Sequence, residues 1–144
     1  MRYLDTSSLV SLYHPEEKSG PLISHLRQHP LPIVFTSLHE AEFSNGLQLK
    51  LFRREATANA VAATMDALRA DADIGVLRRV QPSWPAVFTD VMRLSAAHSG
   101  NLGTRTLDLL HIAAALYLQS VEFVTGDDRQ SKAAAKEGLA VVRI

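Results

Sequence analysis

The 144-residue sequence contains no cysteine, which removes a whole class of chemistry from consideration. Without cysteine there are no disulfide bonds, no thiolate ligands for zinc and no cysteine nucleophile. The chain also has no excess of charge, because 15 basic residues are balanced by 15 acidic ones. This balance argues against a strongly basic coat for nucleic acid, although local basic patches or a bound cation can still supply a positive field.

Long apolar runs are missing as well. The longest uncharged run, residues 109–121, is too short to span a bilayer, and the N-terminal residues show no secretory pattern. Because 47% of the residues are hydrophobic, the chain can bury a core, and its length is typical of one domain. We therefore expect a single soluble domain over residues 1–144, located in the cytoplasm, where a lack of cysteine is common.

Short apolar runs alternate with helical patterns along the chain. Such runs suit buried parallel strands, which lack the polar alternation of half-buried strands. Four strands are expected, at residues 2–4, 33–36, 121–125 and 140–143. Residues 76–80 are expected to form either a fifth strand or the end of a helix. This order predicts an α/β fold in which helices cover both faces of a parallel sheet of four to five strands.

Several boundaries between these elements can be predicted. Ser37 and Glu40 have the spacing of a capping box, so a helix is expected from residue 37 to about residue 54. The next helix, over residues 55–72, has a packing stripe at i, i+4 and i+7 formed by Val61, Met65 and Leu68. Prolines and glycines predict the remaining boundaries. These are the end of a first short helix after Tyr13, closed by Pro15, a helix from residues 82–85 to residues 99–100, a loop at residues 99–104, and a last helix ending at Gly138.

Four acidic residues stand near the points where predicted strands are followed by helices. Asp5 ends the first expected strand, Glu42 follows the second by one helical turn, and Asp127 follows the strand expected at residues 121–125; Asp108 lies near the start of a helix. In an open α/β sheet, ligands gather beyond the carboxyl ends of the strands. Carboxylates brought together there raise one another's pKa unless a cation neutralises them, and hard oxygen ligands suit Mg²⁺ or Mn²⁺. The pattern predicts a metal-dependent phosphodiesterase.

Each of these acidic residues also has a structural explanation. Asp5 can cap the helix that follows it, Asp108 can complement the positive end of its helix, and Asp127 can serve as a turn or cap residue. Asp108 and Asp127 are flanked by apolar residues that we expect to be buried, where an unpaired carboxylate costs several kcal/mol. For any one residue alone both explanations stay open, and the set of four favours the functional one.

Four segments resemble the acidic motifs of PIN-domain ribonucleases. They are YLDTS at residues 3–7, the stretch from Ser37 to Glu42, LDLLHIAA at residues 107–114 and TGD at residues 125–127. They occur in order over nearly the whole chain, and the size of the chain suits the VapC-like toxins of type II toxin–antitoxin systems. The resemblance implies a PIN-like three-layer α/β/α fold and an endoribonuclease that uses one or two Mg²⁺ or Mn²⁺ ions.

The resemblance also implies roles for particular residues and partners. Asp5, Glu42, Asp108 and Asp127 are the implied catalytic residues. Asp5 and Asp108 would bind metal directly, Asp127 directly or through water, and Glu42 would bind metal or orient the attacking water. The implied partners are an RNA substrate, a second copy of the chain, and a small antitoxin whose helix lies in a hydrophobic groove. Residues 38–54 and 55–72 are expected to supply both protein-binding surfaces.

Residues beside the acidic positions are candidates for supporting roles. Thr6 and Thr125 offer hydroxyls that can orient the metal-binding carboxylates, although local capping explains them as well. Arg105 and Arg129 flank acidic positions and are candidates for RNA contact, although basic residues on a helix usually form a solvated face. Gly46 costs its helix about 1 kcal/mol relative to Ala, which suggests close approach of RNA or of a packed helix, or a tolerated accident.

Three further residues have more than one interpretation. Asp128 competes with Asp127, and we expect it to be a helix N-terminal charge. His111 lies one turn after Asp108, and we expect it to be packed and hydrogen-bonded rather than to contact substrate. Glu40 competes with Glu42, and we expect Glu40 to be used in the capping box.

Two other functions compete with the nuclease. An aspartate-nucleophile phosphatase also has a strand-terminal Asp followed by Thr, but it needs a second Asp two residues later, where this chain has Ser7. A catalytically weak RNA- or protein-binding module on the same fold is the other alternative, because fold does not determine function. The four acidic residues favour the enzyme.

Overall fold

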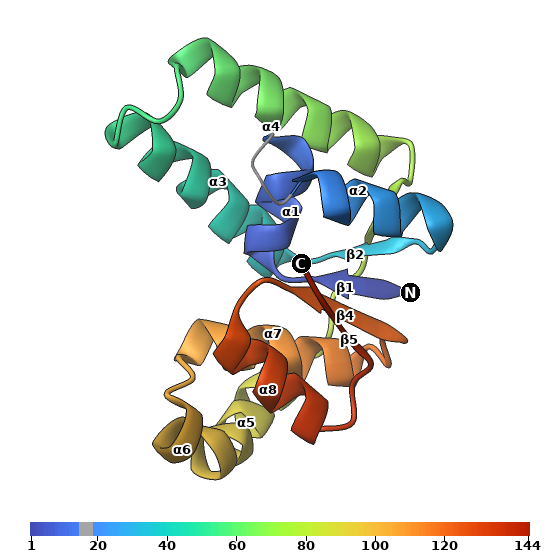
Figure 1. The fold of residues 1–144 in the computed structure, drawn as a ribbon, viewed down its shortest axis with the longest axis vertical. Coiled ribbons are helices and arrows are strands. Elements are labelled where there is room, and N and C mark those ends of the chain that lie inside the picture. The colour runs from blue at the N-terminus through green and yellow to red at the C-terminus, as the bar shows by residue number, and fades with distance from the viewer. Residues whose placement is uncertain (15–18) are drawn as a thin grey trace. The chain divides into compact units, whose positions relative to one another are not determined.

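The computed structural model describes residues 1–14 and 19–144 (Figure 1). They form two compact units: unit 1 consists of residues 1–5 and 81–144, and unit 2 of residues 6–80. The first helix ends at Tyr13, which confirms the predicted helix end, and Pro15 itself lies outside the described residues. Among the residues that are described, no helix is both long and apolar enough to cross a membrane.

Unit 1 is built on three parallel strands. These are β1 (Arg2–Leu4), β4 (Glu122–Thr125) and β5 (Val141–Arg143). β4 pairs with both of the other strands. Tyr3 is in register with Phe123, and the two rings stack with their centroids 5.7 Å apart. Both side chains are fully buried, so this pair lies in the core of the unit.

A buried ion pair joins the first residues of β1 and β4. Arg2 and Glu122 are register partners, and Arg2 Nε donates to Glu122 Oε2 at 2.6 Å. The Arg2 side chain is almost completely buried. A buried charge that has lost its partner is strongly destabilising, so this pair fixes the strand register by penalising any other alignment.

The helices of unit 1 pack as a group. They are α5 (Trp84–Leu94), the π-helical turn η1 (Ser95–Ser99), α6 (Gly100–Leu102), α7 (Thr106–Tyr117) and α8 (Asp128–Lys136). α7 packs against both α5 and α8 (Figure 1). The predicted loop at residues 99–104 is partly wrong, because the helical path continues to Leu102 and only residues 103–105 lie outside the helices. The chain turns at Gly103, whose φ of +68° lies in the left-handed region that favours glycine.

Unit 2 combines two parallel strands with four helices. Its elements are α1 (Thr6–Tyr13), α2 (Ser19–Gln28), β2 (Ile33–Phe35), α3 (Ser37–Phe52), α4 (Ala58–Asp73) and β3 (Leu77–Arg79). β2 pairs with β3 in parallel. The long helices α3 and α4 lie side by side as a hairpin, and α1 packs against α2, α3 and α4 (Figure 1). Residues 76–80, for which a strand or a helix end was expected, therefore contain a strand.

The predicted capping box at the start of α3 is wrong by one residue. The cap is Thr36, whose hydroxyl accepts from the backbone N–H of His39, while the Thr36 N–H donates back to His39 Nδ1 at 3.1 Å. A histidine thus takes the place that Glu occupies in the usual motif. Glu40 instead forms an exposed ion pair with Arg79 of β3, at 3.5 Å.

Two predictions about helix packing can be compared with unit 2. The predicted stripe on α4 is partly wrong, since Met65 is only half-buried and Thr64 is buried in its place. The buried Thr64 hydroxyl is hydrogen-bonded within the helix, because it donates to the carbonyl of Ala60 at 2.8 Å. Gly46 of α3 lies against α1, where an added Cβ would meet Val10 Cγ2 at 3.9 Å. This is an ordinary contact distance, so α1 does not require glycine there.

Candidate active site

Asp5 is held at the end of β1 by both its backbone and its side chain. Its N–H donates to the carbonyl of Val124 at 2.9 Å, which extends the pairing with β4 by one residue. Its side chain is buried, and Oδ2 lies 2.8 Å from the hydroxyl of Thr125. The same hydroxyl accepts from the N–H of Asp127 at 3.0 Å. The Thr125 hydroxyl therefore links the first and the fourth acidic residues.

Asp108 lies in the first turn of α7 and is bonded by the residue that precedes the helix. Its Oδ2 accepts from the backbone N–H of Arg105 at 2.9 Å and from Arg105 Nε at 3.3 Å. The Asp108 side chain is largely buried, while that of Arg105 is 69% exposed. Asp108 thus has the expected structural role at the start of its helix, and the Arg105 guanidinium also neutralises the Asp108 carboxylate.

Asp127 caps α8. Its Oδ1 accepts from the N–H groups of Arg129 at 2.8 Å and Gln130 at 3.0 Å, and its Oδ2 lies 3.7 Å from Arg129 Nη2. Burial raises the pKa of Asp127, but the hydrogen bonds from Gln130 and Arg129, with the charges of Arg129 and Arg105, hold it below its usual value. Asp127 is therefore ionised at neutral pH, next to the two arginines proposed for RNA contact.

Gln130 belongs to the same network and was not identified from the sequence. It is 2% exposed. Its Oε1 lies 2.6 Å from the Thr125 hydroxyl, and its Nε2 donates to the carbonyl of Asp108 at 3.2 Å. Glutamine on an amphipathic helix is usually exposed, so only the three-dimensional contacts single this residue out.

Glu42 belongs to unit 2, where its carboxylate accepts a hydrogen bond from Thr6, one of the residues singled out in the sequence. The hydroxyl of Thr6 donates to Glu42 Oε2 at 2.8 Å, and Thr6 is the residue directly after Asp5 in the chain. Glu42 is half-buried, whereas Glu40 is exposed. The catalytic role of Glu42 stays a prediction from its motif position.

Asp128 and His111, for which more than one interpretation was weighed, both have defined contacts. Asp128 forms surface ion pairs with Lys132 and Arg143, and the hydrogen bond from Lys132 holds the pKa of Asp128 below its usual value. His111 is buried, and its Nδ1 is hydrogen-bonded to the hydroxyl of Tyr3 at 3.0 Å. The expectation of a packed, hydrogen-bonded histidine is confirmed.

The comparison with known families identifies the fold. Residues 2–136 match the model of the PIN domain. The chain belongs to the PIN-domain family. This confirms the expected fold class, an α/β PIN-like fold with a parallel sheet, and one family model spans both units. No curated protein matches the sequence at a significant level.

Solved structures with this PIN fold include three from bacterial pathogens. The structure of FitAcB from Neisseria gonorrhoeae is 16% identical, with coverage of 99% of this chain and 97% of that chain and a TM-score of 0.69. VapC20 from Mycobacterium tuberculosis, described as a sarcin–ricin loop cleaving toxin, is 16% identical over 100% of both chains, with a TM-score of 0.69. VapBC2 from Rickettsia felis, bound to a promoter DNA fragment, is 16% identical over 100% of this chain and 99% of that chain, with a TM-score of 0.68. At these identities the similarity concerns the fold.

The carboxylates of this PIN domain fit a hard divalent cation by their chemistry. Within the described residues, no three Asp, Glu or His side chains are grouped closely enough to form a metal site. Mg²⁺ does not require such a group, because it keeps several waters and is usually bound by one or two carboxylates. Asp5, Asp108 and Asp127 all belong to unit 1, and all three connect to Thr125 or Gln130.

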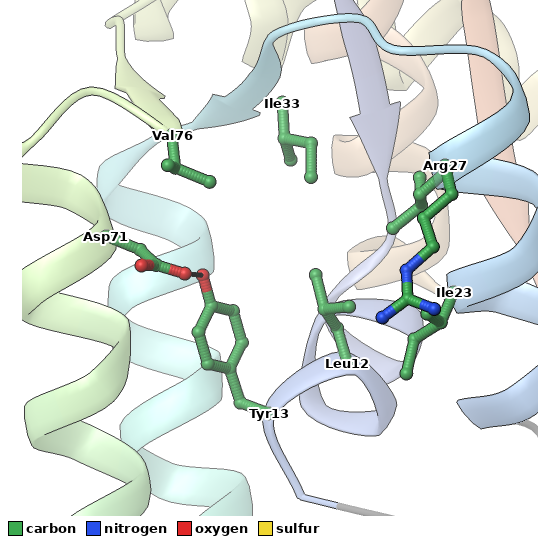
Figure 2. A pocket seen from close by; sticks show the side chains of 8 residues that line it. Leu12, Tyr13, Ile23, Arg27, Ile33, Asp71 and Val76 are labelled. Carbon is green, nitrogen blue, oxygen red and sulfur yellow. Dashed lines mark hydrogen bonds between the residues drawn. The ribbon is translucent and has the colours of Figure 1, made fainter.

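Unit 2 of this PIN domain contains a cavity of about 330 Å³. The side chains that line it are mainly apolar and face a common space (Figure 2); they are Leu12, Tyr13, Ile23, Leu26, Arg27, Ile33, Asp71 and Val76. The Tyr13 hydroxyl donates to Asp71 Oδ2 at 2.7 Å, and burial together with this carboxylate raises the pKa of Tyr13 above its usual value. The cavity thus has apolar walls, one neutral hydroxyl already bonded to a carboxylate, and the guanidinium of Arg27.

Proposed function

We propose that this PIN-domain protein is a divalent-metal-dependent endoribonuclease and the toxin of a toxin–antitoxin pair. The observation that carries the proposal is the network joining the three acidic positions of unit 1. Thr125 contacts Asp5, and Gln130 contacts both Asp108 and Asp127. The family supports a nuclease, and the solved neighbour described as a sarcin–ricin loop cleaving toxin supports RNA as the substrate.

In this proposal Asp5 and Asp108 would hold Mg²⁺ or Mn²⁺ directly, and Asp127 through a water. A bound cation would supply positive charge that makes a water more acidic and offsets the charge developing on the phosphate. Thr125 lies within hydrogen-bonding distance of Asp5 and would keep its carboxylate in place at the end of β1. Glu42, held by Thr6, is proposed to orient the attacking water.

Arg105 and Arg129 are proposed to bind the RNA backbone. Each lies against one of the acidic residues, and their side chains are 69% and 48% exposed. A guanidinium can bind a phosphate through two parallel hydrogen bonds. A chain with no net charge can therefore still place two cations where the scissile phosphate would lie.

Cleavage of single-stranded RNA, in Mn²⁺ and in excess EDTA, tests the proposed reaction. Asp5→Asn is expected to abolish cleavage and keep the fold, because the Asn side-chain oxygen still accepts from Thr125 while the charge that a cation needs is lost. Asp128→Asn is the matched control, because this neighbouring acid is paired with surface cations, and it should cleave like the parent. Equal cleavage by the parent and Asp5→Asn, or cleavage unaffected by EDTA, would refute the metal-dependent mechanism.

We further propose that the cavity of unit 2 receives an apolar side chain of the antitoxin. Its apolar walls offer burial, and Arg27 offers a partner for an acidic residue of the antitoxin. The lining comes from α1, α2 and β2 as well as α4, so it only partly overlaps the surfaces expected at residues 38–54 and 55–72. A short open reading frame upstream of the gene would identify the antitoxin to test. Leu26→Lys should abolish its co-purification, whereas Ala135→Lys, an exposed position of α8 outside these surfaces, should not.

We also propose that the protein forms the homodimer that the resemblance implies. Phe88 and Met92 lie one turn apart on α5 and are 55% and 75% exposed. Two large apolar side chains at that spacing form a stripe suited to association. Sedimentation of the parent and of Met92→Lys tests it, and a parent that sediments as a monomer would exclude the dimer.

A further inference from the structure

We propose that Gln130 is a positioning residue that sets how the carboxylates of unit 1 present themselves to a cation. This inference rests on the proposed function. Gln130 is almost completely buried, and it contacts segments that carry all three acidic residues. Its Oε1 faces Thr125, the partner of Asp5; its Nε2 donates to the carbonyl of Asp108; and its own N–H donates to Asp127 Oδ1.

The orientation of the Gln130 amide follows from its neighbours. An amide group has two donors on nitrogen and acceptors only on oxygen. The carbonyl of Asp108 can only accept, so the end of the amide that faces it, at 3.2 Å, must be the NH₂ group. The carbonyl oxygen of the amide is then directed at Thr125, where it can only accept. This orientation needs no assumption about the protonation of any group.

The Thr125 hydroxyl consequently faces two acceptors. It lies 2.6 Å from Gln130 Oε1 and 2.8 Å from Asp5 Oδ2, and it already accepts from the N–H of Asp127. A hydroxyl has one hydrogen, so Gln130 and Asp5 compete for it. When the hydrogen points to Gln130, Asp5 Oδ2 faces the lone pairs of the hydroxyl oxygen, and a positive charge beside Asp5 becomes more favourable.

This competition couples Gln130 to cation binding. A cation on Asp5 compensates the carboxylate, so the hydroxyl can donate to Gln130 and every buried polar atom in the contact is satisfied. Without Gln130 the hydroxyl would donate to Asp5 alone, and a cation would have to compete with that hydrogen bond. Gln130 therefore favours the cation-bound arrangement without touching the cation.

The first experiment measures Mn²⁺ binding to the purified full-length chain by titration calorimetry. Gln130→Met keeps the length of the side chain and removes both hydrogen-bonding groups. We expect its Mn²⁺ dissociation constant to rise about 10- to 100-fold, the usual effect of losing a residue that orients a metal ligand. Ser131→Ala, a buried position one residue further along α8, should bind Mn²⁺ like the parent. All variants are compared below their melting temperatures, which are measured without metal.

A double-mutant cycle tests the route through Thr125. Thr125→Val removes the hydroxyl at nearly constant shape, whereas Thr125→Ser retains it and should keep Mn²⁺ affinity within about threefold of the parent. Adding Gln130→Met to Thr125→Val should weaken Mn²⁺ binding much less than it does in the parent. Equal losses in both backgrounds would overturn the route through Thr125.

The outcomes separate this inference from the proposed function. A parent that neither binds Mn²⁺ nor cleaves RNA would refute the proposed function itself. A parent that does both, with a Gln130→Met variant that melts lower but binds Mn²⁺ equally well, would leave the nuclease intact and reduce Gln130 to a structural residue. If Gln130→Met does not fold, Gln130→Asn retains the polarity but is too short to span Thr125 and Asp108, and it should show the same loss of Mn²⁺ affinity.

Discussion

Replacing Arg105 by alanine should change metal binding and RNA binding in opposite directions. In the structure the Arg105 guanidinium donates to both oxygens of Asp108, at 3.3 and 3.4 Å. A cation that binds Asp108 must compete with this guanidinium. The backbone N–H of Arg105 also donates to Asp108 and is retained in the alanine variant, so the carboxylate keeps its place at the start of α7.

The expected size of the change in Mn²⁺ affinity follows from the solvent exposure of the Arg105 side chain. The Arg105 side chain is 69% exposed, and exposed ion pairs of this kind contribute roughly 0.2–1 kcal/mol. Arg105→Ala should therefore tighten Mn²⁺ binding by at most about fivefold, since about 1.4 kcal/mol corresponds to a factor of ten. If Arg105 binds one phosphate, RNA affinity should fall, and the salt dependence of binding to single strands should decrease by a slope of about 0.7.

Calorimetry with Mn²⁺, and fluorescence anisotropy with single-stranded RNA in EDTA at several salt concentrations, measure the two effects. Arg69→Ala is the control, because Arg69 is similarly exposed and pairs with Asp66 at the same three-residue separation and 3.5 Å. The control should change neither affinity. Weaker Mn²⁺ binding by Arg105→Ala would refute the competition, and an unchanged salt slope would refute the phosphate contact.

Three more predictions concern single residues. Glu42→Gln should lose most RNA cleavage with little change in melting temperature, because Gln can still accept a hydrogen bond from Thr6. Glu40→Gln should retain cleavage and lose at most about 1 kcal/mol of stability. The reverse order of cleavage rates would reassign the second acidic residue. Gly46→Ala should raise stability to chemical denaturation by about 0.5–1 kcal/mol, because the added methyl meets α1 at contact distance, and a loss would show that α1 cannot accommodate it. Burial raises the pKa of Glu137, but hydrogen bonds from His98 and Arg93 hold it below its usual 4.5. The contribution of Glu137 to stability should be present above about pH 4.5 and lost as the pH falls below that value. Glu137→Gln should therefore lower the melting temperature at pH 7 and match the parent in strong acid. An equal difference in melting temperature at both pH values would exclude Glu137 as the titrating group.

The strands were predictable because buried parallel strands are short, continuous apolar runs. All four expected strands are present within one or two residues of their predicted ends. The end of α5 was not predictable in the same way. Gly100 is a residue type that often stops helices, but here it has helical dihedrals, and it follows a π-helical turn, which is a rare element. The chain therefore stays helical where a loop was expected.

The acidic positions could be predicted because they form motifs, and their immediate contacts could not. Thr36 and Ser37 are both good caps, and the choice between them depends on His39, whose ring closes the box. Gln130 looks like any polar residue of a helix until its contacts with Thr125 and Asp108 are known. Such side-chain contacts depend on the three-dimensional packing and leave no periodic pattern in one sequence.

The pairing of β1 with β4 has a consequence for the newly made protein. Arg2 and Glu122 are 120 residues apart, and closing a loop of that length costs about 4 kcal/mol of chain entropy beyond a constant. During translation β1 emerges before β4, and its partner strand is made about 120 residues later. The residues that position Asp5 are thus synthesised long after Asp5 itself. A chain terminated before β4 would have no Thr125 beside Asp5, so any RNA-cleaving activity would require synthesis to pass β4.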